Sequence, residues 1–142
     1  VTSASRLTSS TFSWMRLTKS SFPSTLDNFF MEKKIDKAEL FLKDTLSEAE
    51  AAEDFGLIIA ACNELGGLYR VLSRYDEGMP LYEKALESLR RIGDAESENY
   101  ATTLINYATI LSMSGRQEEA LDKYKDVVKI LMRQCFSAGS FR

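Results

Sequence analysis

The chain has 142 residues, of which 44% are hydrophobic and 27% are charged, as in an ordinary soluble domain. The net charge is −3, but the first 22 residues carry three basic residues and no acidic one, so the other 120 carry a net −6. An acidic body argues against nucleic-acid binding. Histidine, the commonest general base and metal ligand, is absent. No apolar run approaches the roughly 20 residues that span a bilayer. We therefore expect no enzymatic activity, no metal or cofactor, and neither nucleic acid nor membrane as a partner.

The two cysteines, Cys62 and Cys135, have no other potential metal ligands beside them in the sequence. This pattern does not predict a zinc site, and it favours free thiols over a disulfide. Reducing surroundings, and hence a cytoplasmic location, are the simplest interpretation.

Residues 1–22 differ in composition from the rest, because they are rich in Ser and Thr and free of acids. Three interpretations stay open: an organelle transit peptide, a weakly ordered leader, or translated sequence upstream of a natural start such as Met31. Phe12 and Trp14 are apolar enough to dock on another surface.

From Ser24 onward the pattern is helical. A short, weak helix is expected at about residues 24–32, followed by a stronger one whose apolar stripe comprises Ile35, Ala38, Leu42 and Leu46. Acidic residues 47–54 extend this second helix to a break near residues 54–56.

The next two helices are separated by a short turn at Ser73 and Arg74. Residues 57–72 are almost continuously apolar and predict a buried helix. The following helix starts near Tyr75, or a little later because of Pro80, and ends at Gly93, a plausible C′ residue.

Ser97 is the expected N-cap of a fifth helix, and Ser114 with Gly115 forms the turn before a sixth. The fifth helix has Leu104, Tyr107, Ala108 and Leu111 on one face. The sixth carries Ala120, Leu121, Tyr124, Val127, Val128 and Leu131. In total we expect five strong helices and one weaker first helix, with no strand.

Two stretches match when one is displaced by 42 residues along the other. Eight positions of the first stretch pair with eight of the second, in the order given: Leu65, Gly66, Tyr69, Tyr75, Gly78, Tyr82, Ala85 and Leu86 with Tyr107, Ala108, Leu111, Gln117, Ala120, Tyr124, Val127 and Val128. Small residues fall on small ones and large apolar residues mostly on large ones. A fixed period of this length is typical of a repeat protein, in which each unit packs against its neighbours.

These residues resemble the tetratricopeptide repeat, a helix–turn–helix unit of 34 consensus positions. The 42-residue spacing, with Tyr100–Asn106 and Gly115–Ala120, is similar to the extended type found in kinesin light chains. The resemblance implies an all-α fold, a right-handed α–α superhelix of about six helices in three hairpins. It also implies that Tyr75, Tyr82 and Tyr124 are core residues.

Small residues at the crossing of the two helices let their backbones approach closely. We therefore expect Gly66→Leu or Ala120→Leu to overpack this contact and cost about 1–3 kcal/mol.

The resulting domain prediction has three parts: a leader at 1–22, a repeat domain at 23–136 and a tail at 137–142. Within the domain, an incomplete first repeat covers about 23–52, the second about 55–93 and the third about 97–134. The first helix of the incomplete repeat would come from residues 20–32, where Pro23 fits poorly.

The resemblance implies that the first helix of each repeat lines a concave binding surface. Applied residue by residue, it indicates Asn63, Glu64, Arg70, Thr102, Asn106, Thr109 and Met113 as partner-binding candidates. Asn106 matches an asparagine that often clamps a bound peptide backbone, whereas Asn63 lies one position out of step. The alternative is that both asparagines are simply exposed polar positions.

The leading functional hypothesis is a non-catalytic scaffold that binds a peptide or protein partner in the concave groove. The alternatives are homo-oligomeric self-assembly and a fragment of a larger tetratricopeptide regulator. Self-assembly is suggested by the last helix, whose apolar residues have no following repeat to cover them. Either that helix or the N-terminal leader would form the contact.

Overall fold

The computed structural model describes residues 25–139, so the leader and its apolar residues Phe12 and Trp14 lie outside the described residues. The described part is all-helical and contains no strand. Its helices are α2 (Thr25–Ala51), α3 (Phe55–Val71), α4 (Tyr75–Arg91), α5 (Glu98–Met113) and α6 (Gln117–Ser137). This confirms the all-α repeat fold predicted from the sequence.

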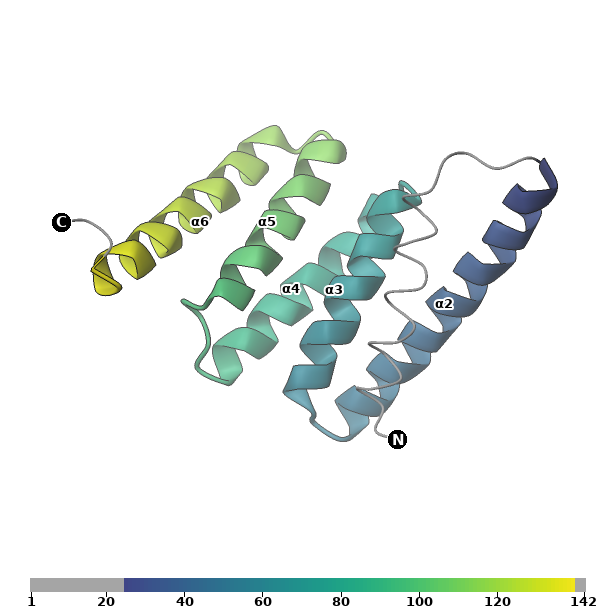
Figure 1. Ribbon diagram of the computed structural model, residues 1–142, viewed down its shortest axis with the longest axis horizontal. Coiled ribbons are helices and arrows are strands. Elements are labelled where there is room, and N and C mark those ends of the chain that lie inside the picture. Colours follow the sequence, from purple (N-terminus) through teal and green to yellow (C-terminus); the bar gives the residue numbers. More distant parts are fainter. Residues whose placement is uncertain (1–24, 140–142) are drawn as a thin grey trace.

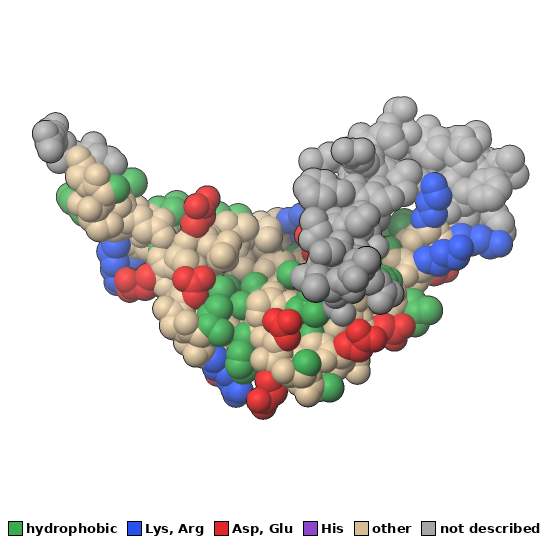
Figure 2. Space-filling model, turned by 60° about the horizontal axis from the view of Figure 1, so that its bottom comes forward, with side chains coloured by type: hydrophobic (Ala, Val, Ile, Leu, Met, Phe, Trp, Pro, Cys, Tyr) green, Lys and Arg blue, Asp and Glu red, His purple; other side chains and the backbone are tan. Residues whose placement is uncertain are grey.

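The helices are stacked in chain order (Figure 1). Within the described residues each helix packs against the next one, and the only contact between non-consecutive helices joins α3 to α5. The pairs α3–α4 and α5–α6 are complete helical hairpins, and α2 precedes them as a single helix. This arrangement is a helical solenoid, in which packing is local along the chain. Figure 2 shows one face of it, on which hydrophobic side chains lie among acidic and basic ones.

The structure corrects the prediction for the start of the repeat domain, because α2 is one continuous helix of 27 residues. The separate short helix expected at about residues 24–32 is not formed, since residues 25–32 are the first turns of α2. No glycine or proline occurs between residues 24 and 55, so nothing in this stretch interrupts the helix. The described residues therefore form five helices rather than six.

The ends of the helices are set by capping and turn residues that can be recognised in the sequence. Ser97 caps α5, because its Oγ accepts a hydrogen bond from the Tyr100 backbone N–H at 3.0 Å. Gly93 and Gly115 follow α4 and α5 with φ of 78° and 90°. These positions confirm the predicted cap and the two predicted glycine turns. Pro80 lies inside α4, which nevertheless begins at Tyr75. A proline has no backbone N–H, so one carbonyl of the preceding turn loses its helical hydrogen bond. Because Pro80 is exposed and close to the first turn, water can solvate that carbonyl.

The crossings of the helices are made by small residues. A Cβ built on Gly66 of α3 would lie 2.8 Å from Cζ of Tyr82, and one built on Gly78 of α4 would lie 2.5 Å from Cδ1 of Ile110. Ala120 is buried at the equivalent position of α6. The close approach predicted at Gly66 is therefore confirmed.

Tyr124 is the exception among the tyrosines expected in the core. Tyr82 is completely buried, but Tyr124 on α6 is exposed and its hydroxyl lies 3.2 Å from Thr109 Oγ1. The prediction that Tyr124 is a core residue is wrong, because within the described chain no helix covers the outer side of α6 as α5 covers α4.

Candidate functional site

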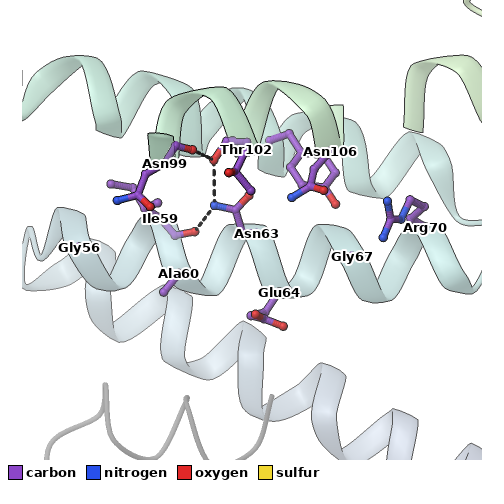
Figure 3. Close-up of a pocket in the computed structure, with 12 residues that line it drawn as sticks. Gly56, Ile59, Ala60, Asn63, Glu64, Gly67, Arg70, Asn99, Thr102 and Asn106 are labelled. Atoms are coloured by element: carbon purple, nitrogen blue, oxygen red, sulfur yellow. Dashed lines mark hydrogen bonds between the residues drawn. The ribbon is translucent and has the colours of Figure 1, made fainter. Parts of the chain in front are cut away.

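A groove of about 470 Å³ lies between α3 and α5, and Tyr82 of α4 also lines it. The residues from α3 and α5 face one another across it, as Figure 3 shows. The α3 side is lined by Gly56, Ile59, Ala60, Asn63, Glu64, Gly67 and Arg70, and the α5 side by Asn99, Thr102, Thr103 and Asn106.

Five of the seven candidate residues line this groove, namely Asn63, Glu64, Arg70, Thr102 and Asn106. The other two do not. Thr109 is occupied by hydrogen bonds to the Ile105 carbonyl and to Tyr124. Met113 lines a different depression, with Ser73 and the first residues of α4.

Asn63 is held in one orientation by its neighbours. Its Nδ2 donates to the Ile59 carbonyl and to Thr103 Oγ1, both at 3.1 Å, and the Thr103 hydroxyl donates to the Asn99 carbonyl at 2.9 Å (Figure 3). The amide nitrogen is therefore occupied. Its Oδ1 is buried and accepts no hydrogen bond from the described residues. Asn63 is thus held rigidly in the groove wall, with its unsatisfied acceptor buried beneath the groove surface.

Tyr82 supplies a second polar atom without a partner. Its ring lies against Gly66, 6.4 Å from the ring of Tyr107, and its buried hydroxyl makes no hydrogen bond within the described part of the chain. Burial raises the pKa of this hydroxyl to about 12. The phenol therefore stays protonated at neutral pH and is able to donate.

The remaining polar residues of the groove are also unengaged. Asn106, Arg70 and Glu64 form no hydrogen bond or ion pair with other described residues, although all three are half-buried. Burial raises the pKa of the Glu64 carboxyl, because the ionised form loses hydration.

Thr103, Asn99 and Tyr82 were not predicted as groove residues. Thr103 is almost completely buried on an otherwise apolar helix face, and such a polar residue signals a hydrogen-bond partner. Its partner, Asn63, is 40 residues away in the sequence, so only the packing of α3 against α5 reveals the pair.

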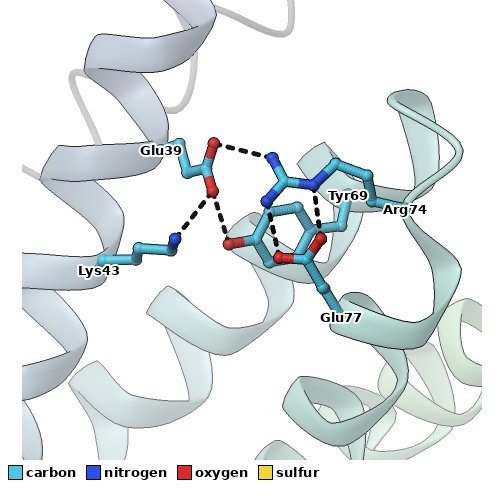
Figure 4. Close-up of polar contacts among 5 residues, drawn as sticks. All are labelled: Glu39, Lys43, Tyr69, Arg74 and Glu77. Carbon is cyan, nitrogen blue, oxygen red and sulfur yellow. Dashed lines mark hydrogen bonds and ion pairs between the residues drawn. The ribbon is translucent and has the colours of Figure 1, made fainter.

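A second polar cluster joins α2 to the α3–α4 hairpin (Figure 4). Glu39 accepts hydrogen bonds from the Tyr69 hydroxyl at 2.8 Å, from Arg74 at 3.0 Å and from Lys43 at 2.9 Å. Arg74 also pairs with Glu77 and stacks over the Tyr69 ring at 4.5 Å. Burial disfavours the ionised Glu39, but these donors outweigh it and hold its pKa at about 2. All members are satisfied, so we assign this cluster a structural role.

The described residues give little support for a metal site, a membrane span or a reactive cysteine. They contain no group of three or more histidine, cysteine or acidic side chains that could hold a metal ion, and no helix among them is long and apolar enough to cross a membrane. Both cysteines are free thiols, and burial raises the pKa of Cys62 to about 12, which makes it a poor nucleophile.

Comparison with known proteins agrees with this architecture. The tetratricopeptide repeat family profile matches residues 57–133, more than half of the chain. The fold is similar to the crystal structure of the TPR domain of Arabidopsis FLU, with a TM-score of 0.63 and 17% identity over 89% of this chain and 98% of that one. No curated protein sequence gives a significant match. The chain belongs to the tetratricopeptide repeat family.

Proposed function

We propose that the chain is a non-catalytic scaffold whose groove between α3 and α5 binds a peptide segment of a partner protein. Tetratricopeptide repeats generally mediate protein–protein interaction. The groove lies on the α3 and α5 face that the resemblance indicated, and five of the predicted residues line it. We also propose that the repeats are of the extended, kinesin-light-chain-like subtype. The loop between α4 and α5 has six residues, whereas each of the other loops between the described helices has three, and the longer loop lengthens the repeat.

The main support is the set of half-buried polar side chains that line the groove and form no hydrogen bond or ion pair with other described residues, namely Asn106, Arg70 and Glu64. A peptide main chain carries one donor and one acceptor per residue. The Asn106 amide can donate to and accept from one such peptide unit. Asn63 Oδ1 and the Tyr82 hydroxyl are also unpaired, but both atoms are buried beneath the groove surface.

The test starts from a displayed library of random peptides, selected against the wild-type chain. Selection against Thr102→Trp runs in parallel, since this exposed groove residue can carry an indole into the groove without disturbing the core. A peptide that binds the wild type and not Thr102→Trp is then titrated against Asn106→Ala. We expect at least about a fivefold loss of affinity, equivalent to one hydrogen bond of about 1 kcal/mol, and an unchanged thermal melt.

Gln117→Ala is the matched control, because it removes an exposed amide outside the groove. It should leave peptide affinity unchanged. Peptides that bind the wild type and Thr102→Trp equally well would contradict the groove as the binding site. Equal affinity of Asn106→Ala would remove Asn106 from it.

The alternative function is self-assembly through the C-terminal helix or the N-terminal leader, and the exposed apolar residues of α6 favour the helix. A cytoplasmic location likewise stays a prediction from cysteine use.

A further inference from the structure

The outer face of α6 repeats an interface that is already formed inside the molecule. On α4, the residues Met79, Tyr82, Leu86 and Leu89 belong to the same core cluster as residues of α5. Displaced by 42 residues, these positions are Leu121, Tyr124, Val128 and Leu131 of α6. All four are apolar or aromatic, as the α4 residues are. The face is therefore built like a helix-packing surface.

The exposure of the two faces is opposite. Leu86 is 3% exposed, whereas Val128, its equivalent, is 54% exposed. Leu121, Met132 and Phe136 on α6 are each more than half exposed as well. A continuous apolar stripe of this size on one helix usually marks a contact with another protein.

The rim of this face does not suit another helix of the α5 type. Where α5 packs on α4, the Tyr107 hydroxyl donates to Glu83 and Arg90 donates to the Tyr100 hydroxyl at 3.1 Å. The equivalents of Glu83 and Arg90 on α6 are Lys125 and Met132. A helix resembling α5 would lose both polar contacts. This argues against a simple continuation of the repeat.

A second α6 suits the face better. The apolar positions 121, 124, 128, 131 and 135 are spaced alternately by three and four residues, the pattern with which two helices pack along a common seam. The charges along α6 are also divided. Residues 117–127 carry four acids and two bases, whereas residues 128–137 carry two bases and no acid. Antiparallel pairing places each acidic half beside a basic half, while parallel pairing places like charges together.

We propose that α6 is a homodimer interface in which two copies pack antiparallel through this stripe, with Val128 near the two-fold axis. The pairing extends the helical stack from one copy into the next and leaves the α3–α5 groove of each copy free. One helix from each copy makes a small interface, so the dimer is expected to dissociate in the micromolar range.

Molar mass by light scattering and sedimentation over about 1–200 µM tests the interface. We expect the wild type to approach twice the monomer mass with rising concentration. Val128→Lys should stay monomeric with an unchanged circular dichroism melt, because residue 128 is exposed. Leu40→Lys is the matched control: it changes an apolar residue on α2 that is also more than half exposed, and it should still dimerise. A monomeric wild type at 200 µM, a dimeric Val128→Lys, or equal loss of dimer in Leu40→Lys would each overturn the proposal.

Crosslinking tests the orientation. In the antiparallel pair the two residues 128 face each other, whereas the two Cys135 lie about 21 Å apart along the helix axis, at 1.5 Å per residue. A bis-maleimide much shorter than this distance should therefore link Val128→Cys/Cys135→Ser into a covalent dimer and leave the wild type unlinked. Efficient linking of wild-type Cys135, with none at position 128, would overturn the antiparallel arrangement.

Discussion

Gly66 shows how a single missing side chain sets the distance between two helices. Its absent Cβ leaves room for the Tyr82 ring, which is completely buried and packed beside Tyr107. Gly66→Leu should lower the free energy of unfolding by about 1–3 kcal/mol, because a Cβ at position 66 would lie only 2.8 Å from Cζ of Tyr82. Urea denaturation measures the loss.

Gly56 provides the control for this substitution on the same helix. It is exposed, and a Cβ there would have only Asp54 Oδ1 nearby, at 3.6 Å. Gly56→Leu should change the stability by less than about 0.5 kcal/mol. Equal effects of the two substitutions would mean that helix propensity, and not the contact with Tyr82, governs position 66.

Glu39 should make the stability depend on pH in the acid range. Its folded pKa of about 2 lies below the usual 4.5, so its ionised form stabilises the fold fully above pH 4.5, and this contribution is lost as the pH falls towards 2. Glu39→Gln should cost about 1–3 kcal/mol at pH 7, since its side chain is only 13% exposed and binds three donors. The difference from wild type should shrink below pH 4.5.

The control for Glu39 is Glu48→Gln, an exposed residue of the same helix whose side chain forms no hydrogen bond or ion pair with the described residues. Denaturation curves at several pH values should show almost no change for it. A pH-independent difference between Glu39→Gln and wild type would contradict the ion-pair explanation.

At the scale of elements, the helix C-termini share one geometry but not one residue type. The first residue after each C-cap has a positive φ. It is Gly after α4, α5 and α6, but Glu53 after α2, with φ 53°, and Ser73 after α3, with φ 59°. A side chain in this region costs about 1–2 kcal/mol, partly offset by the greater freedom of glycine when unfolded. Ser73→Gly should therefore raise the free energy of unfolding by about 0.5–1 kcal/mol. Ser114→Gly, at a C-cap with φ −84°, should not stabilise.

Much of the fold was predictable from short-range signals. The cap at Ser97, the turns at Gly93 and Gly115, and the small residue at Gly66 each act within one turn or one crossing. The continuity of α2 was missed because the resemblance imposed a hairpin where the sequence has no breaker.

The site was predictable only in part. Helical periodicity and the resemblance placed Asn106 on the groove side. They could not show that Thr103 fixes Asn63 through a hydrogen bond, or that Arg74 reaches Glu39 from 35 residues away. Such contacts depend on how helices cross, which is a property of the packed molecule.

At the scale of the whole molecule, packing between consecutive helices should make stability local. Apart from the α3–α5 contact, each described helix packs only against its neighbours in the chain. α6 touches α5 alone, whereas α3 touches α2, α4 and α5. In such an array, stability is approximately a sum over units and their interfaces, so an end helix can open without the centre.

Local stability predicts different hydrogen-exchange patterns for two substitutions that each replace a buried aliphatic side chain with alanine. Ile130→Ala removes a contact between α6 and α5 and should speed exchange in α6, while α3 and α4 keep their protection. Leu68→Ala removes a completely buried side chain from the central α3 and should lower protection in all five helices, because losing α3 separates α2 from the rest. Mass spectrometry of the exchanged peptides separates the two patterns. The comparison is made at low micromolar concentration, so that pairing through α6 does not protect that helix. If both variants lose protection evenly along the chain, the repeats unfold as one cooperative unit, and α6 does not open independently of the centre.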